Sequence, residues 1–450
     1  MKITPLIIPL IIISSTVFSQ SLFEYKRERN DQGSAYSIVN NKLDSYISAG
    51  TEDGIPVFVQ LDLDGNEIWR RYYFTSGSEL STIVGTSDSC IVASCYNAGK
   101  KTISLIKINN NGDSLWTNIY NLNKSYLQVN CIKETYDNGL IITGTQFDDD
   151  FHDIFIWKFD SNGDSLWYNA YPGTDNEWGE SISVSSDSSY VISGMKWFKT
   201  DDRGRDVYLL KVDSVGVLLW DTVFAVKYED YARSVIVNSE DDIILGATFD
   251  RKPTLCKFSE QGTLIWKKDY LKIDEGYINE IIETSLGYAI TGYTQNARLF
   301  AISTNFYGDI LWEKVLYEAG HSYGESLCES SNNSLVIAGV INSANFGNPD
   351  YDFYVINFSS EGNHIFTTIE NQKLDKLFRI YPIPVNEILN IDYNADDYKT
   401  ISYTILDLSG KVVLKGSSNE INVEDLKNGT YLIKIVSEKG LISRKFIKTN

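Results

Sequence analysis

Aromatic and acidic residues gather in several short polar segments of the chain, where they could take part in recognition. Aromatic rings stack on the apolar faces of sugars, and carboxylates accept hydrogen bonds from hydroxyl groups. The candidate ligand-binding residues are Tyr171, Trp178, Trp197, Tyr228, Tyr231, Tyr277 and Tyr323. The structural alternative is that these rings pack loop against loop.

A run of aspartates offers one candidate metal site. Carboxylate oxygens are the ligands that Ca²⁺ prefers, and the candidate ligands are Asp148, Asp149, Asp150 and Asp153. A solvated charge run on a loop is the alternative, and we expect no cofactor beyond this Ca²⁺ candidate. Two further Asp-rich tetrapeptides, residues 62–65 and 160–163, resemble half of an EF-hand loop but lack its final glutamate, and we predict hairpin turns there.

The sequence contains none of the common catalytic motifs. It has no Gly-x-Ser-x-Gly nucleophile motif and no phosphate-binding glycine loop. The three histidines, His152, His321 and His364, have no partners that the sequence can supply. Acidic residues are so numerous that no catalytic pair stands out, and we predict no catalytic residue.

The elements that must position these side chains are repeats. A glycine followed four residues later by an aromatic residue recurs every 46–54 residues through the middle of the chain. The seven aromatic positions are Trp69, Trp116, Trp167, Trp220, Trp266, Trp312 and Phe366. Seven copies at one period indicate a repeat architecture.

Each repeat contains four short strands separated by polar turns. An apolar strand ending at glycine, as in Leu140–Gly144 and Tyr190–Gly194, is followed by an alternating strand such as Asp206–Asp213. Four strands per repeat predict an all-β, seven-bladed β-propeller. The glycine–tryptophan spacing resembles the tryptophan-docking repeat of quinoprotein-like propellers, which implies that the aromatic residue packs between adjacent blades.

Two segments compete to close this predicted ring. Leu22–Tyr25 resembles the tryptophan-bearing strand without a blade before it, and we expect it to pair with the last blade. The repeat copy around Phe366 competes for the same position. The sequence leaves this choice open.

The N-terminus has the features of a secretory signal peptide. Lys2 provides the positive charge, Leu6–Ile13 the apolar region, and residues 17–19 an acceptable cleavage site. A membrane-spanning helix needs about 20 apolar residues, so we predict a signal at 1–19 and no membrane span. The five cysteines show no pairing pattern, and we expect most of them to be buried as small hydrophobic residues.

The charge distribution separates the end of the chain from its middle. The chain has 40 Lys and Arg against 60 Asp and Glu, a net charge of −20, which argues against nucleic-acid binding. Residues 375–450 hold 11 basic and 10 acidic residues, so the acidity belongs to the repeats. We therefore predict a propeller over 20–370 and a linker with a small β-sandwich over 371–450.

The C-terminal segment contains an ordered set of short motifs: a Tyr-Pro-Ile-Pro start, an Asp-x-x-Gly-Lys hairpin, a Leu-x-x-Gly-x-Tyr strand and a basic, apolar end. The residues that carry them are Tyr381, Pro382, Pro384, Asp407, Gly410, Lys411, Gly429, Tyr431 and Lys448. This set resembles the type A C-terminal sorting domain of the type IX secretion system, in which Asn is usual at the position of Ile383. The resemblance implies an export signal read by the secretion machinery at the outer membrane of a Gram-negative cell. Such tails are usually removed, and the cargo is released or attached to surface lipopolysaccharide.

These observations predict a secreted or cell-surface, non-enzymatic propeller that binds an extracellular carbohydrate or protein. One alternative is a glycan-active hydrolase or lyase that uses Asp or Glu on the propeller face. Another is a structural or adhesive surface protein. A hydrolase would show a deep central pocket with two converging acids, one of raised pKa, whereas a binding protein would show an aromatic shelf or a flat face.

Overall fold

The structure, a computed structural model, describes residues 22–26, 33–41, 45–74, 77–121, 126–148, 151–173, 175–198, 204–224, 230–271, 275–316, 321–342, 351–364, 379–392, 401–407, 412–437 and 440–449. The predicted signal peptide lies outside these ranges. Contacts divide the chain into two units, Met1–His364 and Ile365–Asn450. Each unit is described by itself.

The first unit forms seven four-stranded antiparallel sheets in its described residues, which we call blades 1 to 7. Blade 1 consists of β2 (Gly33–Asn40), β3 (Ser45–Glu52), β4 (Ile55–Asp62) and β5 (Glu67–Arg71). Blade 2 consists of β6 (Ser78–Gly85), β7 (Ile91–Asn97), β8 (Thr102–Ile108) and β9 (Ser114–Asn121). Blade 3 consists of β10 (Tyr126–Glu134), β11 (Leu140–Asp148), β12 (Phe151–Phe159) and β13 (Ser165–Tyr171). Blade 4 consists of β14 (Asn176–Val184), β15 (Tyr190–Trp197), β16 (Arg205–Val212) and β17 (Leu218–Phe224). Blade 5 consists of β18 (Tyr231–Val237), β19 (Ile243–Phe249), β20 (Lys252–Phe258) and β21 (Leu264–Asp269). Blade 6 consists of β22 (Gly276–Thr284), β23 (Gly287–Thr294), β24 (Leu299–Asn305) and β25 (Ile310–Val315). Blade 7 consists of β26 (Ser322–Glu329), β27 (Leu335–Asn342), β28 (Tyr351–Phe358) and β1 (Glu24–Lys26).

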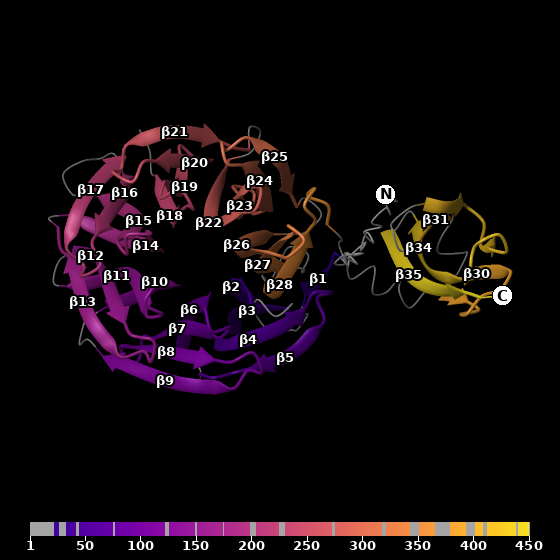
Figure 1. The fold of residues 1–450 in the computed structure, drawn as a ribbon, viewed down its shortest axis with the longest axis horizontal. Helices are drawn as coiled ribbons and strands as arrows, with labels where there is room; N and C mark the ends of the chain where they lie inside the picture. The colour runs from indigo at the N-terminus through magenta and orange to yellow at the C-terminus, as the bar shows by residue number, and fades with distance from the viewer. Residues whose placement is uncertain are drawn as a thin grey trace, which may run out of the picture. The chain divides into compact units, whose positions relative to one another are not determined.

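The blades stand in a ring (Figure 1), with the first strand of each repeat toward the centre and the last at the rim. Each sheet packs against the sheets before and after it, because a small sheet cannot bury both of its faces alone. The predicted β-propeller fold is therefore confirmed. In each blade the second and fourth strands end on the face of the ring where the first and third strands begin, and the described hairpin turns after the first and third strands lie on the other face.

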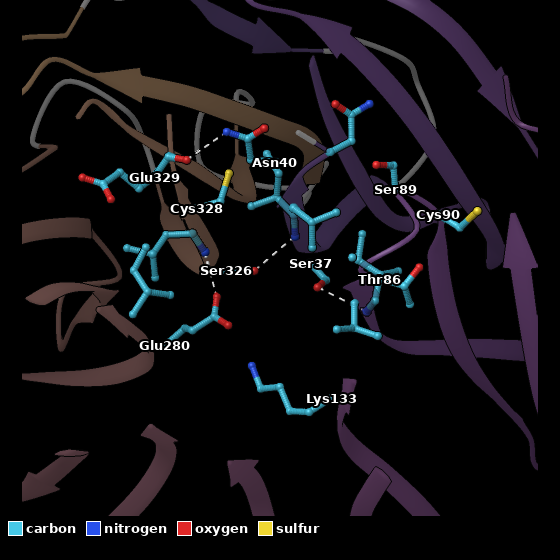
Figure 2. A pocket seen from close by; sticks show the side chains of 18 of the residues that line it. Ser37, Asn40, Thr86, Ser89, Cys90, Lys133, Glu280, Ser326, Cys328 and Glu329 are labelled. Carbon is cyan, nitrogen blue, oxygen red and sulfur yellow. Dashed lines mark hydrogen bonds between the residues drawn. The ribbon is translucent and has the colours of Figure 1, made fainter. Parts of the chain in front are cut away.

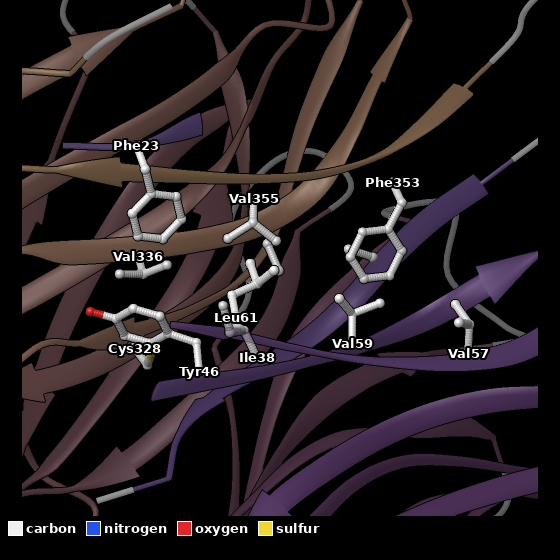
Figure 3. Packing of buried hydrophobic residues seen from close by; sticks show 12 residues of the cluster. Phe23, Ile38, Tyr46, Val57, Val59, Leu61, Cys328, Val336, Phe353 and Val355 are labelled. Atoms are coloured by element: carbon white, nitrogen blue, oxygen red, sulfur yellow. The ribbon is translucent and has the colours of Figure 1, made fainter. Parts of the chain in front are cut away.

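Strand β1 closes the ring. It pairs antiparallel with β28, so the fourth strand of blade 7 comes from the start of the chain. Figure 3 shows Phe23 packed with residues of blades 7 and 1, including Val355 and Tyr46. The competing segment around Phe366 lies outside the described residues.

The repeated glycine and tryptophan hold adjacent blades together. Each tryptophan packs on the glycine of the next repeat: Trp69 on Gly112, Trp116 on Gly163, Trp167 on Gly216, Trp220 on Gly262, Trp266 on Gly308 and Trp312 on Gly362. These glycines have φ of 77–83°, and a Cβ atom there would lie 2.7–3.3 Å from the indole. Backbone conformation and close packing both require glycine at this position. Phe23 covers Gly65 in the same way at the closure.

A tyrosine four residues after the tryptophan completes this contact in several blades. The Tyr73 hydroxyl donates a hydrogen bond to the Gly112 carbonyl (2.6 Å), and the Tyr270 hydroxyl donates to the Gly308 carbonyl (2.8 Å). The glycines sit in turns that begin with a side-chain acceptor. Asp62 and Asp160 each accept backbone N–H groups two and four residues ahead, so the predicted hairpin turns at these positions are confirmed.

The second unit has two antiparallel sheets. One contains β29 (Arg379–Tyr381), β30 (Ile388–Asp392) and β33 (Glu420–Asn422), and the other β32 (Val412–Gly416), β31 (Ile401–Leu406), β34 (Gly429–Ser437) and β35 (Gly440–Lys448). Their shared core includes Leu389, Ile405 and Ile433. Tyr431 stacks on Phe446 and donates to the Lys427 carbonyl (2.8 Å), whereas Gly410 and Lys411 of the sorting motif lie outside the described residues.

Candidate functional site

A β-bulge in each innermost strand builds the central channel. The pairing register shifts by one residue at the same position in all seven blades, at Tyr36, Ser81, Asn130, Glu180, Arg233, Asn279 and Glu325. A bulge adds one residue to the strand and re-aims its side chains. These seven bulge residues line a cavity of about 120 Å³ in the channel, and we call them the bulge layer.

The position opposite these bulges explains why the repeated apolar strand ends at glycine in the sequence. A Cβ on Gly194 would lie 1.8 Å from the Trp178 carbonyl oxygen, and one on Gly339 would lie 1.9 Å from that of Tyr323. In these blades the bulged strand approaches its neighbour too closely for a side chain there, whereas blades 2 and 5 have Cys95 and Ala247 at the paired position. The bulge thereby fixes the residue two positions before it, which faces the channel one layer higher. We call this upper layer the mouth.

The mouth brings together four of the predicted ligand-binding residues. Trp178, Tyr231, Tyr277 and Tyr323 occupy the same position in blades 4 to 7, each two residues before a bulge. All four side chains are half-buried. The remaining mouth residues, Ser34, Glu79 and Gln128, are polar, so one side of the mouth is aromatic and the other is polar.

Further side chains join these four into one row. The Arg205 guanidinium lies 5.3 Å from the Trp178 ring and 5.9 Å from that of Tyr231. The ring centroids of Tyr231 and Tyr277 are 5.8 Å apart. The row continues through Tyr293, Tyr323 and Tyr351, with successive centroids 5.3, 4.9 and 6.3 Å apart. At the other end, His152 stacks on Trp178 at 5.2 Å.

Two tyrosines of the row, Tyr293 and Tyr323, stay protonated at physiological pH. Burial raises the pKa of Tyr323 to about 12, and burial also raises the pKa of Tyr293 despite the nearby Arg233. Their hydroxyls can therefore both donate and accept hydrogen bonds. The row combines apolar ring surface with neutral polar groups.

Charged residues lie directly beneath the row, in the bulge layer. Arg233 donates to Asn279 Oδ1 (2.8 Å), and the Asn279 amide donates to Glu325 Oε2 (3.1 Å) and to the Gly324 carbonyl (2.9 Å). Burial raises the pKa of Glu180 and of Glu325, although Arg233 opposes both shifts. The channel thus holds two carboxyls that take up protons more readily than exposed ones.

These two carboxyls should make stability fall as pH rises. In the unfolded chain they titrate near pKa 4.5, and in the folded chain they keep their protons to higher pH. The folded state therefore binds more protons in the window above about pH 4.5, and its free energy of unfolding decreases there. We expect Glu180→Gln with Glu325→Gln to flatten this decrease in urea unfolding measured from pH 4.5 to 8. An unchanged slope would contradict the assignment.

The other predicted ligand-binding residues are not part of the row. Tyr171 half-buries its ring between blades 3 and 4, and its hydroxyl donates to the Gly216 carbonyl (2.8 Å), so it belongs to the tryptophan–glycine contact. Trp197 ends β15 with 44% of its surface exposed and contacts no aromatic ring in the described part of the chain. Tyr228 lies outside the described residues.

The structure leaves the Ca²⁺ prediction open. Asp149 and Asp150 lie outside the described residues, and the Asp148 side chain is not described either. Asp153 is buried in β12, where Gln146 donates to its Oδ2 (3.4 Å). Within the described ranges, no group of three or more His, Cys, Asp or Glu could hold a metal ion.

Sequence reasoning missed His152, Arg205, Tyr293 and Tyr351, which complete the row. It also missed the bulge layer. The mid-repeat glycines were a usable signal, because each marks a bulge on the strand before it and hence a channel-facing residue. The acidic neighbours of Tyr351 in residues 350–352 were a further signal, whereas no comparable signal marks Arg205, which begins the third strand of blade 4.

Comparison with known proteins identifies the end of the chain. Residues 379–449 match the family described as the secretion system C-terminal sorting domain. A search of curated proteins finds no match to the chain. In the described ranges, no helix has the length and apolarity needed to cross a bilayer.

Three solved structures resemble the chain weakly. PorZ of Porphyromonas gingivalis, an essential surface component of the type IX secretion system, has 13% identity and a TM-score of 0.45; the match covers 91% of this chain and 58% of PorZ. A Bacteroides caccae protein of unknown function has 12% identity and a TM-score of 0.39, with 58% and 88% covered. Sqt1 of Chaetomium thermophilum, bound to the N-terminus of ribosomal protein L10, has 12% identity and a TM-score of 0.45, with 73% and 86% covered. These likenesses carry no information on ligand or activity.

The family match shows the destination of the chain. The matched region begins in β29 and ends just after β35, so it covers both sheets of the second unit. The predicted resemblance of this segment is confirmed. Residues 379–449 are a secretion system C-terminal sorting domain, and the chain is a type IX export substrate that reaches the cell surface or the extracellular space.

Proposed function

We propose that the chain is a non-enzymatic surface protein whose propeller binds an extracellular carbohydrate at the mouth of its channel. The observation that carries this proposal is the row of aromatic side chains from Trp178 to Tyr351, which spans four consecutive blades. Apolar sugar faces pack on such rings, and the neutral tyrosine hydroxyls bind sugar hydroxyls. The secretion machinery is the partner of the C-terminal tail.

The charge of the chain favours a neutral glycan. A net charge of −20 repels polyanions such as uronate-rich or sulfated polysaccharides. The bulge layer beneath the row offers carboxylate and amide acceptors together with Arg233, which suit hydroxyl groups. A neutral oligosaccharide end can insert toward these groups while its rings rest on the row.

The test of this proposal removes the centre of the row. We expect Tyr277→Ala and Tyr323→Ala each to weaken binding of a neutral glycan by about fivefold or more, because stacking contacts of this kind contribute on the order of 1 kcal/mol. Calorimetric titration of the purified chain measures this. Tyr307→Ala is the matched control, since Tyr307 is 75% exposed in a hairpin turn on the opposite face. Binding by both row variants at wild-type affinity would refute the site.

A glycan hydrolase remains the second candidate because of Glu180 and Glu325. Both carboxyls have raised pKa values and lie beneath the row, and a general acid requires such a shift. New reducing ends released from a bound glycan, and lost in Glu180→Gln or Glu325→Gln, would favour the hydrolase. Binding without new reducing ends would favour the binding protein.

A further inference from the structure

The channel contains a second cavity on the side of the hairpin turns, which adjoins the bulge-layer cavity and shares Lys133 and Glu280 with it. It measures about 350 Å³, within the usual size range of ligand pockets. Its lining is mixed. Ile38, Val39, Ile83 and Val84 from blades 1 and 2 form an apolar wall, and polar and charged side chains complete the rest. Figure 2 shows two charged side chains, Lys133 and Glu280, extending into this cavity and toward one another.

Glu280 departs from a rule that other blades follow. In four blades the residue after the bulge is a serine that links the blade to the next one by a hydrogen bond. Ser37, Ser181, Ser234 and Ser326 accept the backbone N–H groups of Ile83, Val235, Ile281 and Ile38. In blade 6 this residue is Glu280, whose Oε2 accepts the Leu327 N–H at 2.8 Å. A serine would suffice for this hydrogen bond between blades, and the glutamate adds a carboxylate that faces the cavity.

Lys133 departs from the repeat in a matching way. The residue three positions after the bulge is apolar, serine or cysteine in the six other blades: Val39, Val84, Ser183, Ile236, Ile282 and Cys328. Only blade 3 has a charge there. Lys133 makes no hydrogen bond or ion pair within the described ranges, so its ammonium group is available to a ligand.

The two charges face one another from blades 3 and 6, which lie across the ring. They do not form an ion pair. Burial raises the pKa of Glu280, and the Lys133 charge opposes part of this rise. The other carboxylates at the cavity are already engaged, since Glu283 and Glu329 accept hydrogen bonds from the turn residues Ser239 and Ser285. Lys133 and Glu280, which also accepts the Leu327 N–H, are therefore the cation and the carboxylate that an occupant can meet.

We propose that this cavity binds a small zwitterion, a free amino acid or short peptide with an apolar side chain. Its carboxylate meets Lys133 and its ammonium group meets Glu280, while the side chain packs on the apolar wall. A ligand with only one charge would leave the other protein charge enclosed and unpaired, which is costly. The cavity is too small for a polymer, so its ligand differs from the glycan proposed for the mouth.

The test measures, by calorimetric titration, how tightly the purified chain binds leucine and leucyl-leucine. We expect at least one of them to bind, and both N-acetyl-leucyl-leucine and leucyl-leucinamide to bind at least about tenfold more weakly, because each lacks one charge. The comparison of leucine with leucyl-leucine separates an amino acid from a peptide. If neither leucine nor leucyl-leucine bound, or if the capped peptides bound as tightly as leucyl-leucine, the proposal would be overturned. This result needs no variant of the protein.

Two substitutions restore the residues that the repeat itself uses. Lys133→Val introduces the residue that blades 1 and 2 have at this position. Glu280→Ser introduces the serine that accepts the hydrogen bond between blades elsewhere in the ring, so both variants should fold. Each should weaken the bound probe at least about tenfold, whereas Lys100→Met, which removes an exposed charge on the opposite face, should not. Tyr277→Ala should leave probe binding unchanged, so the two sites fail independently. Wild-type affinity in Lys133→Val would exclude the proposed site.

Discussion

Replacing Trp69 with alanine is expected to lower the free energy of unfolding by about 3–5 kcal/mol. The indole is 9% exposed, covers Gly112 of the next blade and donates through Nε1 to the Asn110 carbonyl (2.9 Å). The substitution removes all of these contacts and leaves a cavity between two blades. Urea unfolding followed by intrinsic fluorescence measures the loss.

The neighbouring residue provides the control for this experiment. Ile68 precedes Trp69 on the opposite face of β5 and is 54% exposed. Ile68→Ala should change stability by no more than about 0.5 kcal/mol. If the two variants were equally stable, tryptophan docking would not be what holds the blades together.

Introducing a charge at the closure should have a comparable or larger effect. Phe23 is 6% exposed between blades 7 and 1, and its backbone carbonyl accepts the Asn357 N–H (3.0 Å). Phe23→Asp would bury an unpaired carboxylate there, with an expected loss of at least about 4 kcal/mol. Opening of the ring would also expose the edge of β28, which favours self-association.

Denaturant unfolding and light scattering together check this second expectation. Tyr307→Asp is the control, because it introduces the same charge at an exposed aromatic position. We expect a destabilised, partly associated Phe23→Asp variant and an unchanged Tyr307→Asp variant. A stable monomer in both cases would mean that another segment closes the ring.

The repeat architecture could be predicted because its pattern is local and recurs. Gly112 and Trp116 stand in one sequence motif, so their spacing was visible. Their actual partners, Trp69 and Gly163, stand one repeat away on either side. The sequence therefore indicated docking but did not show that each tryptophan reaches forward to the next glycine.

The candidate site was only partly predictable, for a geometric reason. Trp178 and Tyr277 lie 99 positions apart in the sequence, and the bulges alone place them at one level of the channel. Tyr171 has the same residue type but belongs to an outer strand, where its hydroxyl holds Gly216. Residue type suggested aromatic recognition, whereas strand position within the blade determined which rings meet.

Thermal melting of the intact purified chain against a panel of neutral glycans tests the central claim most directly. A glycan at 100 times its Kd should stabilise the propeller by about 2.7 kcal/mol, which appears as a raised melting temperature. We predict such a shift for at least one neutral glycan and its loss in Tyr323→Ala. No shift with any glycan would contradict carbohydrate binding and would leave a protein-contacting or structural surface ring.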